Sequence, residues 1–200
     1  MTNASLRRVV IVVALLNLGY FGIEFTVALR IGSVSLFADS IDFLEDASVN
    51  LLILLALAWS ARRRARVGML LAGILLVPAL ATVWALWHKF QVPTPPEPVP
   101  LSLTGLGALL VNSSCALMLA RFRTQGGSLT RAAFLSARND AVANVAIIVA
   151  GGITALTQSV WPDVVVGVGI GLLNLDAARE VWEAARDEHL AARGAVNDDV

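Results

Sequence analysis

Residues 39–46 read Asp39-Ser40-Ile41-Asp42-Phe43-Leu44-Glu45-Asp46, and they lie inside an otherwise apolar segment over residues 33–58. A single aspartate at the centre of a membrane helix costs about 2.5–3.5 kcal/mol on insertion scales, so four acids in eight residues indicate a function that offsets this cost. Asp39, Asp42 and Asp46 are spaced by three and then four residues and share one helical face, whereas Glu45 points to a neighbouring sector. This pattern predicts a buried cation site.

The composition is typical of a membrane protein. The chain has 200 residues, of which 57% are hydrophobic and 15% charged, and its mean hydropathy is +0.74; soluble domains are more evenly divided between apolar and polar residues. A net charge of zero offers no basic excess for phosphate groups, which argues against a nucleic-acid partner. The single cysteine, Cys115, excludes an internal disulfide framework and a cysteine-only metal site.

Six segments are long and apolar enough to cross a bilayer, which takes about 20 residues per helix. They cover residues 6–29, 33–58, 67–87, 101–120, 128–156 and 161–185. We therefore predict an all-α membrane protein, with a six-helix transmembrane bundle over residues 1–186 and a short charged cytoplasmic tail over residues 187–200. The first apolar run follows Arg7-Arg8 and has no small-residue cleavage site, so we expect a retained helix and not a signal peptide. The proline-rich residues 92–100 are predicted to form an extended loop.

The positions of Lys and Arg predict the orientation of the bundle. If the N-terminus is cytoplasmic, thirteen of the fifteen basic residues lie inside or at the inner ends of helices, and only Arg30 and Lys89 lie outside. The thirteen are Arg7, Arg8, Arg62, Arg63, Arg64, Arg66, Arg121, Arg123, Arg131, Arg138, Arg179, Arg186 and Arg193. We therefore predict that both termini are cytoplasmic in a multi-pass protein of a bacterial-type inner or plasma membrane.

Two of the predicted helices repeat oxygen-bearing side chains at four-residue steps: Asp42, Asp46 and Asn50 in one, and Ser136, Asp140 and Asn144 in the other. Facing helices that each carry such a row can assemble a metal site in a bundle. Asp42, Asp46 and Asp140 are the strongest candidates for ligands, because the membrane segments hold too few cations to balance three carboxylates. A divalent cation or protons would balance them.

The other buried polar residues admit a structural or a functional explanation. Glu24 could pair with a basic residue, face a water cavity, or take part in function. Asp39 and Glu45 suit hydrogen-bonding support of the ligands or proton relay, and Asn50 and Asn144 suit hydrogen bonds between helices. Arg138 could form an ion pair with Asp140 or Glu45, or it could lie at the cytoplasmic boundary with its charge extended toward water. His88 and His189 are predicted to lie at the surface.

Two sequence stretches resemble the cation diffusion facilitator family. Residues 32–46 resemble its second transmembrane helix, in which a Gly-Ser pair precedes Leu-x-Ala-Asp and two metal ligands four residues apart; Asp42 and Asp46 occupy the ligand positions. Residues 136–144 resemble its fifth helix, where Asp140 matches the second ligand and Ser136 stands at the position usually held by His or Asp. Asn17 and the Trp161-Pro162-Asp163 stretch also suit the family.

The resemblance implies export of a divalent metal ion by alternating access in exchange for protons. It implies Zn²⁺, Cd²⁺ or Co²⁺ as cargo, and we favour Zn²⁺, although ligation by oxygen alone leaves Mn²⁺ open. It also implies a homodimer. The chain resembles a membrane-domain-only branch, because no cytoplasmic metal-sensing domain would fit after the sixth helix.

Two other functions are alternatives to transport. An intramembrane aspartyl hydrolase would also use two aspartates on facing helices, but it needs them to share a proton at close range, and an i,i+4 pair on one helix suits chelation better. A non-transporting scaffold derived from a transporter would be consistent with Ser136 and the short C-terminal tail. Against the scaffold, a bundle without Asp42, Asp46 and Asp140 would be less costly to insert.

Overall fold

The computed structural model describes residues 3–56, 80, 82–122 and 127–173. Its long helices are α1 (Asn3–Ile31), α2 (Val34–Ala56), α4 (Pro98–Ala120) and α5 (Gly127–Thr157). Two shorter helical stretches cover residues 82–91 and Trp161–Leu173. The described residues thus form six helical segments, which confirms the all-α prediction.

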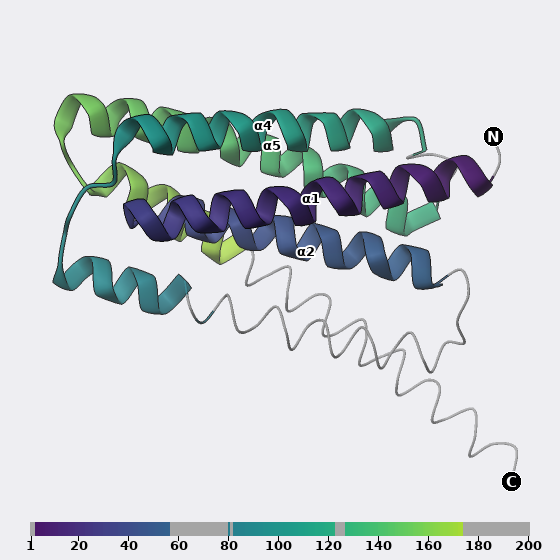
Figure 1. Cartoon of the computed structure of the whole chain (residues 1–200), viewed down its shortest axis with the longest axis horizontal. Helices are drawn as coiled ribbons and strands as arrows, with labels where there is room; N and C mark the ends of the chain where they lie inside the picture. Colours follow the sequence, from purple (N-terminus) through teal and green to yellow (C-terminus); the bar gives the residue numbers. More distant parts are fainter. Residues whose placement is uncertain (1–2, 57–79, 81, 123–126, 174–200) are drawn as a thin grey trace, which may run out of the picture.

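The four long helices pack around a common core. α1 lies against α2 and α4, α5 lies against α4 and α2, and all four run roughly along the long axis of the molecule (Figure 1). The stretches 82–91 and Trp161–Leu173 lie toward the end of the bundle where α1 turns into α2, at the left of Figure 1. This arrangement brings the acidic face of α2 to the helix that carries Asp140.

Within the described residues, the helix boundaries agree with the predicted ones to within a few residues. The largest differences are at the proline-rich segment, because the helix before it continues to residue 91 instead of 87, and α4 begins at Pro98 instead of 101. Proline fits the first helical turn, where its missing N–H is not needed, so the predicted loop is shorter than expected. Predictions for residues 57–79, 123–126 and 174–200, including His189 and the charged tail, lie outside the described residues.

A tight turn joins α1 to α2. Gly32 has φ +63°, a left-handed conformation that glycine adopts without steric cost. The Ser33 N–H donates to Ala28 O at 3.1 Å, which is the bond of a Schellman-type helix end. Ser33 Oγ then accepts from Leu36 N–H at 3.1 Å and caps the start of α2. The two helices therefore become antiparallel neighbours over only two residues.

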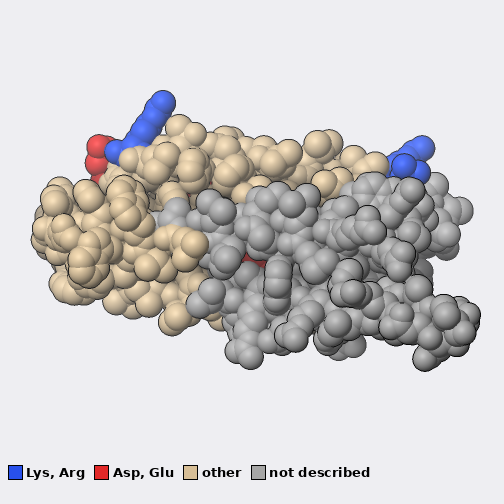
Figure 2. Space-filling model, turned by 90° about the horizontal axis from the view of Figure 1, so that it is seen from below, with Lys and Arg blue, Asp and Glu red and all other residues tan. Residues whose placement is uncertain are grey.

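Three described helices are long and apolar enough to cross a membrane by length and composition: Ser5–Ile31 within α1, Pro98–Ala120, and Ala133–Thr157 within α5. α2 is also 23 residues long, but its acidic cluster sets it apart from these three. Figure 2 shows basic side chains of the described part near the two ends of the molecule, and the described surface between them is almost entirely uncharged apart from a small acidic patch near the centre. Such a band suits a bilayer, which excludes unpaired charge.

Two apolar clusters form the core, one toward each end of the bundle. Near the α1–α2 turn the buried cluster includes Ala28, Leu36, Ile41, Leu101 and Ile147; toward the other end it consists of Val10, Val13, Cys115, Leu119, Ala133 and Ala137. Beside these clusters the same helices bury polar side chains, chiefly Asn17, Glu24, Asp39, Asn112 and Asn144. We call these five residues the polar layer. It lies in the buried interior of the bundle, where an unpaired polar group is costly.

Candidate metal-binding site

Asp46 of α2 and Asp140 of α5 meet at one serine hydroxyl. Ser136 Oγ donates to Asp46 Oδ1 at 2.8 Å and lies 3.5 Å from Asp140 Oδ2. Ser136 and Asp140 are one turn apart on α5, as the four-residue spacing predicts. Three of the four predicted ligands therefore lie together across the α2–α5 interface.

Asp42, the fourth predicted ligand, is half-buried one helical turn from Asp46. It lies within electrostatic range of Asp140, Asp39, Glu45 and Asp46. Among the described residues, however, no three or more His, Cys, Asp or Glu side chains are already grouped closely enough to hold a metal ion.

Asp39 belongs to the polar layer and contacts α5. Asn144 Nδ2 donates to Asp39 Oδ2 at 2.6 Å, and Asn144 Oδ1 accepts from Asn112 Nδ2 at 3.0 Å. A row of hydrogen bonds thus connects α2, α5 and α4 in the membrane-spanning core. The predicted role of Asn144 as a hydrogen-bonding residue between helices is seen in this geometry.

Glu24 lies on α1 with none of its surface exposed, and its described neighbour is an acid. It is within hydrogen-bonding reach of Asp39, and Tyr20 and Asp42 are within electrostatic range. No donor in the described part of the chain reaches either carboxylate oxygen of Glu24. The alternative of pairing with a basic side chain therefore has no support among these residues.

Three predicted side chains differ from expectation or lie at the periphery. Asn50 Nδ2 donates to the Asp46 backbone carbonyl at 2.8 Å on its own helix, so the predicted bond to another helix is replaced by this local one. Arg138 is exposed and donates to its chain neighbour Asn139 at 3.2 Å, consistent with a boundary position. Glu45 is half-buried, within electrostatic range of Asp46.

A second polar cluster joins the start of α2 to the stretch Trp161–Leu173. The buried carboxylate of Asp163 accepts from Ser33 Oγ and Ser35 Oγ, both at 2.6 Å, and from the backbone N–H groups of Val34 and Ser35 at 2.9 and 3.1 Å. These N–H groups open the helix and have no partner within it, and the positive end of the helix dipole favours the carboxylate. Asp163 therefore fixes α2, and with it the acidic row, against the last described helix.

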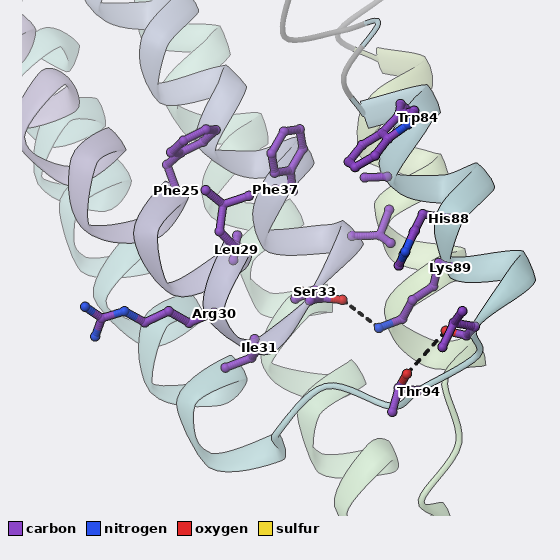
Figure 3. A pocket seen from close by; sticks show the side chains of 15 residues that line it. Phe25, Leu29, Arg30, Ile31, Ser33, Phe37, Trp84, His88, Lys89 and Thr94 are labelled. Carbon is purple, nitrogen blue, oxygen red and sulfur yellow. Dashed lines mark hydrogen bonds between the residues drawn. The ribbon is translucent and has the colours of Figure 1, made fainter.

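Beside this cluster lies a cavity of about 660 Å³ between the α1–α2 turn and residues 82–94. Lys89 Nζ donates to Gly32 O at 2.6 Å across it, and Figure 3 shows Lys89 reaching toward the turn at Ser33, with His88 and Trp84 on the same wall as Lys89 and Phe37 on the other. His88 lies beside the exposed Trp84, with ring centroids 5.8 Å apart. The surface position predicted for His88 agrees with this exposure.

Sequence reasoning missed two residues that organise the site. Asn112 could have been found as an amide inside a predicted membrane helix, the same signal that drew attention to Asn144. Asp163 was noted only as part of the Trp161-Pro162-Asp163 stretch that suits the family, and its contact with α2 joins residues about 130 positions apart in sequence. No local pattern predicts such a contact.

Comparison with known protein families identifies the family of this chain. The model of the cation efflux transmembrane domain matches residues 10–187, which include every predicted ligand and all the described helices except residues 3–9 at the start of α1. No curated protein sequence shows significant similarity to the chain. The chain is therefore a multi-pass membrane protein of the cation diffusion facilitator family, whose members transport divalent metal cations and are not enzymes.

Proposed function

We propose that this transporter exports Zn²⁺, or the related ions Cd²⁺, Co²⁺ or Mn²⁺, by alternating access in exchange for protons. Asp42, Asp46 and Asp140 would supply carboxylate ligands, and Ser136 would supply a hydroxyl. The observation that carries the proposal is the contact of Asp46, Ser136 and Asp140 across the α2–α5 interface. Family membership removes the hydrolase alternative.

The chemistry of the cluster suits a passing dication. Carboxylates close together cannot all stay ionised in a water-poor interior unless a cation neutralises them. On ion entry, the carboxylates of Asp42, Asp46 and Asp140 would neutralise the charge of the ion; on ion release, protons would take its place. Oxygen ligands alone hold Zn²⁺ less selectively than a set with nitrogen, which leaves Mn²⁺ within the proposed range.

The basic residues support the proposed orientation. Arg7 and Arg8 near the start of α1 and Arg121 after α4 lie at one end of the bundle, whereas Arg30 and Lys89 lie at the other end, by the α1–α2 turn. The first end would face the cytoplasm under the positive-inside rule. A bacterial-type inner or plasma membrane and a homodimer belong to the same proposal.

The test is Zn²⁺ uptake into inverted vesicles, with a pH-sensitive dye reporting counter-movement of protons. We expect Asp46→Asn and Asp140→Asn to abolish metal-dependent proton movement while the protein still inserts. Glu97→Gln is the matched control, because Glu97 is exposed before α4 and its side chain makes no capping bond. Unchanged transport in both aspartate variants would refute the site.

The scaffold alternative makes an opposite prediction for the wild-type chain. A non-transporting scaffold would fold and insert normally but would move no Zn²⁺, Cd²⁺, Co²⁺ or Mn²⁺. Direct titration of the purified chain with these four ions separates the two proposals, since only the transporter needs to bind one of them at the membrane site.

A further inference from the structure

Glu24 and Asp39 face each other from α1 and α2 in the polar layer, and neither has any exposed surface. Both oxygens of Glu24, and Oδ1 of Asp39, lack a donor among the described residues, although the two carboxyl groups are within hydrogen-bonding reach of one another. An ionised carboxylate only accepts hydrogen bonds. A hydrogen bond between the two groups therefore requires a proton on one of them.

The surrounding amides fix which oxygen is left for this bond. Asn144 donates to Asp39 Oδ2 at 2.6 Å, and its own oxygen is held by Asn112 at 3.0 Å. Because Asn112 holds the oxygen of Asn144, the Asn144 amide has little freedom to flip. Asp39 is thus oriented with one oxygen satisfied by the amide and the other available to Glu24.

Two negative carboxylates in contact without a cation are strongly unfavourable in a dry interior, and a shared proton relieves the repulsion. We propose that Glu24 and Asp39 form a buried carboxyl pair that holds one proton, and that this proton leaves when a metal ion binds at Asp42, Asp46 and Asp140. The O–H bond of the pair breaks, the proton passes to water, and no redox change occurs. The coupling of this proton to metal binding rests on the proposed function, whereas the existence of the carboxyl pair does not.

The groups around the pair support such coupling. Tyr20 faces it from α1, Asp42 from α2 and Asp140 from α5, all within electrostatic range of Glu24 or Asp39; α4 contributes the neutral Asn112 and has no charged residue in its sequence. Without metal, the negative charge that remains on the ligand carboxylates, Asp42 and Asp140 among them, favours a proton on the pair. A dication bound at those aspartates makes the local electrostatic potential positive and therefore favours release of the proton from the pair.

Infrared difference spectroscopy of the purified full-length chain tests the pair without relying on transport. We expect the wild type without metal to show a carbonyl band of a protonated carboxylic acid that shifts in D₂O. Glu24→Gln and Asp39→Asn are nearly isosteric and should each remove part of this band. Glu97→Gln, which changes an exposed glutamate, should leave it intact. Bands that stay the same in both pair variants would overturn the proposal, as would a wild type that shows no acid band.

Proton release during Zn²⁺ titration in weak buffer tests the coupling. We expect Glu24→Gln to release about one proton fewer per bound ion than the wild type, and its Zn²⁺ affinity to fall by no more than about tenfold, because the replaced charge is not a ligand. Equal proton release in the variant and the wild type would overturn the coupling. If instead the proposed function were wrong, the wild type would bind no metal, while its acid band would still depend on Glu24 and Asp39.

Discussion

Ser136 Oγ donates to Asp46 Oδ1 at 2.8 Å and thereby joins α5 to α2 at the level of the acidic row. The same hydroxyl is 3.5 Å from Asp140 Oδ2. The side chain at position 136 is thus close to one carboxylate from each of the two helices. If these groups bind the ion, the side chain at position 136 should influence which ion they prefer.

Replacing Ser136 tests this directly. Ser136→His adds a nitrogen ligand and should raise the affinity for Zn²⁺ relative to Mn²⁺, because imidazole suits Zn²⁺ whereas oxygen ligands suit Mn²⁺. Ser136→Cys should move the preference toward Cd²⁺, because a soft thiolate ligand suits a soft metal ion. Calorimetric titration of each variant with the three ions measures the shift. If the order of affinities is the same in the wild type and both variants, Ser136 does not contact the ion.

Metal binding should also stabilise the fold. An ion that binds the native state alone adds about 2.7 kcal/mol to the free energy of unfolding when its concentration is 100 times Kd. Thermal unfolding of the detergent-solubilised chain with and without Zn²⁺, followed by chelation, measures this increment. Asp140→Asn should lose most of it. Glu97→Gln should keep it, since Glu97 is exposed outside the helices. An equal increment in Asp140→Asn and the wild type would place the bound ion elsewhere.

The sequence predicted the helices and the acidic row because both depend on short-range periodicity. Asp42 and Asp46 share a face by their spacing alone, and the Gly32-Ser33 turn was visible as the break between two apolar runs. Spacing within a helix does not specify which face meets which neighbour. The contact of Glu24 with Asp39, and the bonds of Asp163 to the start of α2, depend on that packing and were therefore not predicted.

Asp163 should be a large contributor to stability. Its carboxylate accepts four hydrogen bonds from the first residues of α2, and Asp163→Asn replaces one accepting oxygen with a donor that faces other donors. We expect the free energy of unfolding to fall by about 1–3 kcal/mol, the usual cost of leaving buried polar groups without partners. Denaturant titration in detergent measures the change.

Thr26→Ala is a suitable control for Asp163→Asn. The hydroxyl of Thr26 is exposed and bonds to the Gly22 carbonyl on its own helix, so its loss should change stability by no more than about 0.5 kcal/mol. If the two variants were equally stable, the network at the start of α2 would contribute nothing beyond an ordinary exposed hydrogen bond.

Gly167 should tolerate no side chain, whereas Gly169 two residues later should. A Cβ added at Gly167 would lie 2.8 Å from the Ser35 nitrogen and from the Val34 carbonyl carbon, both backbone atoms that cannot move without shifting α2; at Gly169 nothing lies within 4 Å. Gly167→Ala should therefore cost about 1–3 kcal/mol through overpacking.

In Gly169→Ala the helix propensity of alanine should dominate, with a gain of up to about 1 kcal/mol. The same denaturant titration measures both glycine variants. Because Asp163 and Gly167 hold the same turn of α2, Gly167→Ala should also weaken Zn²⁺ binding by displacing the acidic row. A Gly167→Ala protein as stable as the wild type would mean that the close approach of Trp161–Leu173 to α2 is not needed to position that row.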